Sequence, residues 1–191
     1  MRINIKKIIS RILIVLGISI IGINYYTIYK VEKENKNIVL QYEKSINSGK
    51  KMQEVIKLNE DIVGILKIPK INLEVAVKEG TDKETLKYAV GHFEQTAMPG
   101  EDGNFSVAGH RAYTTNKFFS NLDKLEIGDE LNMLYMDTTH SYKVNSIEVV
   151  EPDEVEVVDS MDKDKKEITL VTCTPKFSGT HRLVVKGTYV Q

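Results

Sequence analysis

The sequence predicts a mainly β domain, a barrel or a sandwich, that follows an N-terminal transmembrane helix and a polar linker. From residue 62 onward, short β-like runs alternate with turn residues, and no βαβ rhythm is present. Ahead of them, four basic residues precede a long apolar run. The chain has 191 residues, 41% of them hydrophobic and 28% charged, which suits one folded domain and argues against wholesale disorder.

The apolar segment predicts a membrane anchor. It covers residues 12–29, and about eighteen residues at ~1.5 Å each reach roughly 27 Å, close to the ~30 Å hydrocarbon core of a bilayer. Tyr25, Tyr26 and Tyr29 at its far end suit the membrane–water interface. A cleaved signal peptide or a buried core helix would also give an apolar run of this kind. No small-residue cleavage site follows the segment, so we expect it to be retained.

The basic flank sets the expected topology, because positively charged flanks stay on the cytoplasmic side. We therefore expect residues 1–11 to be cytoplasmic, 12–29 to span the cell membrane once, 30–61 to form a linker, and the folded domain of 62–191 to be extracellular. The linker is polar, with spaced apolar positions that could line a helix broken near Ser48 and Gly49. These positions are Ile38, Tyr42, Ile46, Val55 and Leu58. We expect this linker to be a solvated spacer that lifts the domain off the membrane.

The strand signals are spread over the whole C-terminal domain. They lie at residues 64–69, 71–77, 104–108, 130–136, 141–150, 167–173 and 181–190. Only residues 83–88 and 116–125 read as short helices. The formal net charge of −1 gives no reason to expect a nucleic-acid partner.

Cys173 is the only cysteine, so no intramolecular disulfide can form. It is either an inert buried thiol or a reactive one. It ends one β-like run, and the next run begins at His181 and Arg182 after a loop. Symmetric closure of that hairpin places Cys173 opposite Arg182, and Val171 opposite Val184.

Strand alternation decides which histidine can serve as the acid–base group. His181 and Arg182 must point to opposite faces, so a base beside Cys173 has to come from elsewhere. His110 ends an apolar strand at the start of a polar loop, where functional side chains are commonly displayed. His92 either lines the site or packs in a turn, and His140 reads as a surface turn residue.

These residue types fit covalent catalysis at a carbonyl. A thiolate near two cationic side chains is stabilised as the nucleophile. The permanently charged Arg182 can stabilise an oxyanion or position a peptide backbone. His110 can protonate a leaving amine and then deprotonate the incoming nucleophile.

Metal binding has weaker support. Carboxylates crowd the segment before Cys173, and Ca²⁺ prefers such ligands, but no EF-hand spacing is present. They are Glu148, Glu151, Asp153, Glu154 and Glu156. A Ca²⁺ site is therefore possible and no cofactor is required; one cysteine and scattered histidines do not support structural zinc.

Three motifs together resemble the sortase family. They are Thr169-Leu-Val-Thr-Cys173, Ala108-Gly-His110-Arg111 and Arg182-Leu-Val-Val, in the family's order, with a loop resembling the family's at Met98-Pro-Gly-Glu101. The resemblance covers roughly residues 62–190. It implies a closed eight-stranded β-barrel and a catalytic set of Cys173, His110 and Arg182. It also implies that neutral Cys and His predominate at rest, with the thiolate–imidazolium pair as the minor active form.

The resemblance further implies a substrate and an acceptor. The enzyme would cleave an LPxTG-like sorting signal of surface proteins between Thr and Gly, through a thioester on Cys173. An amine of the cell wall, such as that of a peptidoglycan precursor, would resolve the thioester. We expect Thr172 and His92 to contact the substrate.

The subclass is less sharply marked. The motif after Ala108 and the pair Phe118-Phe119 resemble class D sortases, which we favour. Cys173-Thr-Pro and Thr180-His-Arg182-Leu resemble the pilin-polymerising class C, whose lid motif and second, C-terminal membrane helix are not found in this sequence. Two competing hypotheses for the function are a thiol hydrolase with water as acceptor and a non-catalytic extracellular β-domain.

Overall fold

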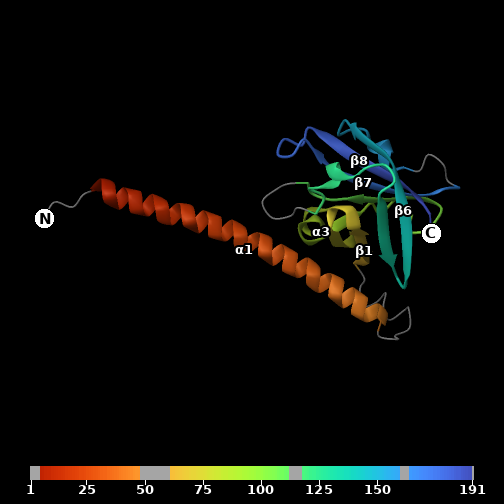
Figure 1. Cartoon of the computed structure of the whole chain (residues 1–191), viewed down its shortest axis with the longest axis horizontal. Helices are drawn as coiled ribbons and strands as arrows, with labels where there is room; N and C mark the ends of the chain where they lie inside the picture. The colour runs from red at the N-terminus through yellow and green to blue at the C-terminus, as the bar shows by residue number, and fades with distance from the viewer. Residues whose placement is uncertain (1–4, 48–60, 112–117, 160–163, 191) are drawn as a thin grey trace.

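The computed structural model describes residues 5–47, 61–111, 118–159 and 164–190. Within these ranges the fold is one closed β-barrel beside one long helix (Figure 1). The predicted stripe positions Val55 and Leu58, and the predicted helix break at Ser48 and Gly49, lie outside the described residues.

Eight strands close the barrel in the order β1-β2-β3-β4-β7-β8-β6-β5. Their bounds are β1 Ile62–Ile68, β2 Leu73–Glu79, β3 Val90–His92, β4 Gly103–Ala108, β5 Glu130–Tyr135, β6 Thr138–Val150, β7 Lys166–Thr174 and β8 His181–Tyr189. β2–β3 and β4–β7 are parallel, and the other neighbouring strands are antiparallel. The predicted mainly β fold and the closed eight-stranded barrel are therefore confirmed.

Alternation along the strands divides the interior of the barrel from its outer face. Ile168 and Leu170 of β7 belong to the main hydrophobic core with Leu183 and Val185 of β8. The residues between them, such as Val171, point outward. Thr172 continues the inward set, and Cys173 therefore lies on the outer face.

The short elements follow the prediction in part. Helix α3, Lys83–Tyr88, has the predicted bounds, and the Asp82 side chain caps its N-terminus. Strand β3 and the 3₁₀ turn η3, Val155–Val158, were not predicted. In the described part of the helix predicted over 116–125, the structure has only the 3₁₀ turn η2, Leu122–Lys124.

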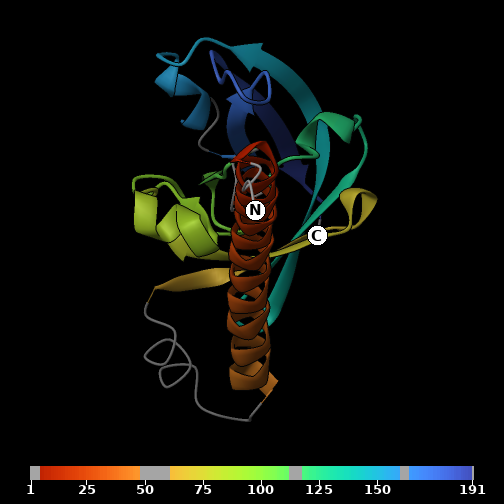
Figure 2. The ribbon, with the colours of Figure 1, turned by 90° about the vertical axis from the view of Figure 1, so that its left-hand side faces the viewer.

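Helix α1, Ile5–Asn47, runs without interruption from the apolar segment into the linker. Among the described residues it is the one helix long and apolar enough to cross a membrane, and its apolar stretch is not buried against the rest of the protein. Figures 1 and 2 show that its N-terminal half projects away from the barrel, whereas its C-terminal half runs beside the strands.

The C-terminal half of α1 packs on the barrel, which the spacer prediction did not anticipate. Val39 and Tyr42 form a second apolar cluster with Ile65, Ala76 and Ala89 on the outer face of the barrel. The predicted solvated spacer is therefore wrong for residues 30–47. The physical reason is the helical stripe itself, whose apolar side chains are removed from water by this contact.

Candidate active site

Cys173 and Arg182 are direct partners across the β7–β8 ladder. The same register pairs Val171 with Val184, as predicted, and places Thr174 opposite His181. Facing residues of an antiparallel pair have Cβ atoms about 4.5–5.5 Å apart and share one face of the sheet. The predicted hairpin register is confirmed.

The β7–β8 loop lies directly over the thiol. A Cβ added to Gly179 would be 3.4 Å from the Cys173 Cβ and 3.7 Å from its Sγ, and Gly179 has a φ of +62°. One nitrogen of Arg182 donates to the Gly179 carbonyl at 3.1 Å and to the His181 carbonyl at 3.0 Å. Arg182 therefore holds the loop near the thiol, and Cys173 remains partly exposed.

The parallel β4–β7 pair brings His110 to the same face. Ala108 pairs with Val171, and the Gly109 N–H donates to the Val171 carbonyl at 3.1 Å. If this register continued for two residues beyond β4, His110 would lie level with Cys173. The three predicted catalytic residues are thus contributed by three neighbouring strands or strand ends.

Gly109 permits the close packing that fixes this turn. A Cβ at position 109 would lie 2.6 Å from the Cδ2 of Phe119 and 2.9 Å from the Cγ1 of Val90. The Phe119 N–H donates to the His110 carbonyl at 3.1 Å. Because Phe119 is fully buried, the backbone that carries His110 rests on the barrel core.

Burial sets the protonation preference of His110. The half-buried ring has a pKa lowered from its ordinary value of 6.5, because burial disfavours the charged imidazolium. The neutral form is therefore the resting form near neutral pH.

Arg111 is a site residue to which the sequence motif assigned no role. Its guanidinium donates to the Thr174 hydroxyl and, at 3.4 Å, to the Cys173 carbonyl. It also lies 3.1 Å from the Asp123 carboxylate. The side chain is 8% exposed, so a charged clamp beneath the surface joins the His110 turn to the end of β7. The sequence feature that could have identified Arg111 is its position as a charged residue directly after His110.

The two predicted substrate contacts are placed away from the surface. Thr172 points into the barrel, and its hydroxyl donates to the Gly109 carbonyl at 2.7 Å. His92 is 1% exposed, with Nδ1 2.8 Å from the Glu79 carboxylate and its ring stacked on Phe105. The Thr172 side chain supports the backbone beside His110 from within, whereas His92 packs in the interior rather than lining the site.

A cavity of about 330 Å³ opens on the Cys173 face of the barrel. Its lining includes Val171 of β7, Arg182 of β8 and residues of η3. The lining residues are mostly apolar: Phe93, Gln95, Pro152, Glu154, Val155, Val157, Val158, Asp159, Val171 and Arg182. An apolar ligand in this groove would contact Arg182, the ladder partner of Cys173.

The acidic segment does not converge on a metal site in the described part of the chain. No group of three or more His, Cys, Asp or Glu side chains there is arranged to hold an ion. Glu148 instead pairs with Lys186 at 3.1 Å, and Glu151 lies 3.3 Å from Nε2 of His181.

The fold and site define a β-barrel protein with a candidate cysteine nucleophile on its outer face. The protein-family model for the sortase domain matches residues 66–190. The chain therefore belongs to the sortase family, whose members are cell-surface-associated cysteine transpeptidases.

Individual relatives agree with this assignment. Sortase A of Bacillus anthracis is 32% identical over 98% of this chain and 95% of its own length. Sortase D of Bacillus subtilis (strain 168) is 35% identical over 59% of this chain, and the match spans only 54% of that protein. Among solved structures, the Clostridium perfringens Sortase D5 transpeptidase is similar with a TM-score of 0.73 and 34% identity, covering 83% of this chain and 99% of that one. Sortase C-1 of Streptococcus pneumoniae has a TM-score of 0.66 and 30% identity, covering 69% and 68%.

Proposed function

We propose that this protein is a membrane-anchored transpeptidase that cleaves an LPxTG-like sorting signal between Thr and Gly. The observation that carries the proposal is the position of Cys173 directly opposite Arg182, with the His110 turn on the neighbouring strand. The substrates are surface proteins with such a signal at the C-terminus. The acceptor is an amine of the cell wall, such as that of a peptidoglycan precursor.

The residues divide the reaction between them. The Cys173 thiolate attacks the Thr carbonyl carbon, and the Arg182 guanidinium stabilises the developing oxyanion. His110 as imidazolium protonates the amine of the departing Gly, which leaves a thioester. The neutral His110 then takes a proton from the incoming amine, and attack on the thioester releases the thiolate. Burial lowers the pKa of His110, so the imidazolium form that protonates the leaving amine is a minor population near neutral pH.

The groove gives the sorting signal a binding path. Its apolar walls suit the Leu and Pro of an LPxTG-like peptide, and its lining includes Arg182, the ladder partner of Cys173. A class D-like subclass is supported by the similarity to the Clostridium perfringens Sortase D5 transpeptidase and to Sortase D of Bacillus subtilis.

The full chain, in detergent or in liposomes, can be offered LPxTG-like peptides with and without an amine acceptor. We expect cleavage after Thr and, with the amine, a ligated product in place of the hydrolysed one. Cleavage that yields only acid at saturating amine would instead identify a thiol hydrolase.

The membrane anchor is tested separately on cells stripped of their wall. The basic flank of α1 supports a topology with the N-terminus in the cytoplasm and the barrel outside. External protease should therefore degrade the barrel, and full protection of the barrel on intact stripped cells would refute this topology.

A further inference from the structure

The C-terminal half of α1 is fastened to the barrel through the edge of β2. The Asn35 side chain accepts from the Ala76 N–H at 3.0 Å and donates to the Glu74 carbonyl at 3.3 Å. Among the described strands, β2 pairs on that side with β3 only, from Val77 onward, so the Asn35 side chain satisfies backbone groups of Glu74 and Ala76 that none of these strands reaches. The residue is 6% exposed. A buried amide with two backbone partners fixes the helix against sliding and rotation.

A second attachment lies about two turns further along α1. The Tyr42 hydroxyl accepts from the Met136 N–H at 2.9 Å and donates to the Val63 carbonyl at 3.2 Å. Tyr42 is 3% exposed. Met136 directly follows β5, so this attachment marks the barrel end at the β5–β6 turn. In Figure 1 this hairpin points toward the C-terminal end of α1.

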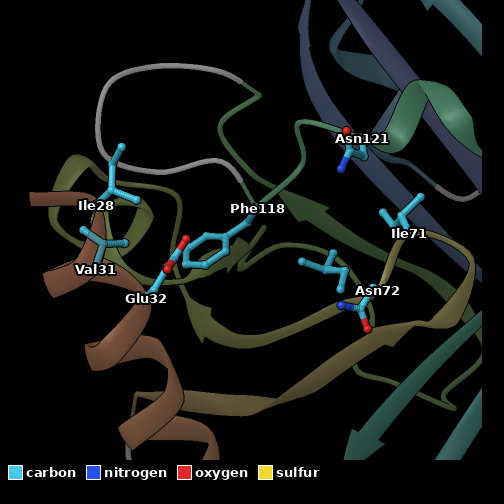
Figure 3. Close-up of a pocket in the computed structure, with 8 residues that line it drawn as sticks. Ile28, Val31, Glu32, Ile71, Asn72, Phe118 and Asn121 are labelled. Carbon is cyan, nitrogen blue, oxygen red and sulfur yellow. The ribbon is translucent and has the colours of Figure 1, made fainter. Parts of the chain in front are cut away.

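The opposite end of the barrel meets α1 where the helix leaves the predicted bilayer segment. Ile28 and Val31 of α1 line a cavity of about 170 Å³ together with Ile71, Phe118 and Asn121 of the barrel (Figure 3). Ile28 belongs to the predicted membrane span of residues 12–29, and Val31 follows it. This barrel end therefore lies at the level of the lipid headgroups if the span is as predicted.

The candidate catalytic residues lie at this same end. Phe119, next to Phe118, donates to the His110 carbonyl. Along β6, Arg182 pairs with Val150 at one terminus, whereas Thr138 at the other terminus adjoins the β5–β6 turn. β6 has 13 residues, so the strand separates these ends by up to ~40 Å. The thiol and the Tyr42 attachment are thus at opposite ends of the barrel.

We infer that α1 is one rigid strut that holds the barrel with its catalytic end against the membrane surface. Lipid headgroups are the partner of the edge formed by Ile71, Phe118, Lys176 and Phe177. Lys176 lies 3.8 Å from Asp123 near η2, which brings the β7–β8 loop to this edge, and Phe177 is 77% exposed. An exposed aromatic ring beside a lysine suits the membrane interface. Helix α1 contains no proline that would kink it.

This inference rests on the proposed membrane anchor, and it adds a fixed orientation to it. A freely tethered barrel would tumble and present the thiol in all directions. A docked barrel instead keeps the thiol close to the lipid surface, where it meets peptide segments that emerge from the membrane.

The test uses the full chain in liposomes that carry nitroxide quenchers at headgroup depth. Cys173→Ala removes the native thiol, and a single fluorophore is attached at Phe177→Cys, at Asp137→Cys in the β5–β6 turn, or at Ile20→Cys in the predicted span. We expect the headgroup quenchers to reduce the fluorescence of the label at position 177 strongly. The label at position 137 should keep almost all of its fluorescence. Asn35→Ala together with Tyr42→Phe should reduce this contrast while α1 remains in the membrane.

Quenchers on the lipid acyl chains test the membrane anchor separately from the orientation of the barrel. Quenching at position 20 by these lipids supports the anchor, and equal quenching at 177 and 137 would then overturn the orientation alone. Absence of quenching at position 20 would remove the anchor and the orientation together. Thermal unfolding of each labelled chain confirms that the barrel is folded.

Discussion

Cys173 on β7 and Arg182 on β8 face each other as partners of one antiparallel ladder, whereas His181 faces Thr174. Successive strand residues point to opposite faces, so Arg182 shares the outer face with the thiol and His181 does not. His181 instead lies 3.3 Å from Glu151, with 42% of its side chain exposed. We therefore expect Arg182 to act in catalysis and its neighbour His181 to have no catalytic role.

Arg182→Ala should lose peptide cleavage by at least ~10²–10³-fold, because removal of one oxyanion donor typically costs that much. Arg182→Lys keeps the charge without the planar fork and should recover only part of the rate. His181→Ala is the matched control and should keep most of the activity. The measurements are cleavage and amine ligation, with thermal unfolding beside them. A folded but inactive His181→Ala variant would mean that the catalytic face is assigned wrongly.

Cys173→Ala should abolish acyl transfer, since the chain has no other thiol and the neighbouring Thr172 hydroxyl points into the barrel and donates to the Gly109 carbonyl. His110→Ala should be almost as severe. The double variant should be little worse than either single one, because residues that act as a unit are non-additive. Single-turnover thioester formation, followed by mass spectrometry, measures the step directly. Substantial turnover by Cys173→Ala would rule out the covalent mechanism.

The hairpin register could be predicted because it depends only on local closure and alternation. The pairing of Val171 with Val184 follows from the same symmetry. The role of α1 could not be predicted in this way, since a sparse apolar stripe does not say which surface covers it. Asn35 reads as an ordinary polar helix residue, and only the barrel shows the two backbone groups that it satisfies.

In the site, too, local patterns could be predicted from the sequence, whereas contacts between distant segments could not. His92 is a histidine, a common catalytic residue type, and the sequence alone does not show that it is buried. Its burial against Phe105 depends on contacts between distant segments. Strand β3 has only three residues, too few for an alternating pattern to be recognised. Arg111 was visible within the histidine motif, yet its partner Asp123 lies in a turn whose position the sequence does not specify.

Arg111→Ala should destabilise the barrel by about 1–3 kcal/mol, because charge-assisted hydrogen bonds to Asp123 and to the end of β7 are lost. Arg111→Lys should restore little, since one ammonium cannot bridge both partners. The alkylation rate of Cys173 should change as well, because the clamp positions its strand end. Lys176→Ala removes the longer, 3.8 Å contact to the same Asp123 and should change stability by less than about 0.5 kcal/mol. Equal effects of the two alanine variants would contradict the clamp.

Stability should depend on pH through the two histidines whose pKa values are lowered. Burial lowers the pKa of His110, and burial together with Lys166 lowers that of His140. The unfolded chain therefore binds more protons than the folded one as the pH falls through the ordinary value of 6.5. The free energy of unfolding should be greatest above that pH and should decline below it, toward the lower folded pKa values.

Denaturant unfolding at several pH values between about 8 and 5 measures this effect. The double variant His110→Asn and His140→Asn should show a flatter dependence across that window, because neither asparagine titrates. A wild-type stability that rises as the pH falls through 6.5 would contradict the assignment.

Gly109→Ala tests whether close backbone packing holds His110 in place. The added methyl would lie 2.6 Å from the buried ring of Phe119, so the ring or the turn must move. We expect about 1–3 kcal/mol of destabilisation from overpacking. We also expect a loss of kcat, because the Phe119 N–H bond to the His110 carbonyl is displaced.

The compensating change is Phe119→Ala, which removes the Cγ and Cδ2 atoms that would lie nearest to a Cβ at position 109. Alone, this change leaves space in the core and should destabilise the protein. Combined with Gly109→Ala, it should cost less stability and less kcat than the sum of the two single changes, with a coupling of about 0.5–3 kcal/mol in the double-mutant cycle. Additive effects of the two changes would show that Gly109 is not required for the contact with Phe119. The His110 backbone would then be held by other contacts, of which the Thr172 hydroxyl bond to the Gly109 carbonyl is the first to test by Thr172→Val.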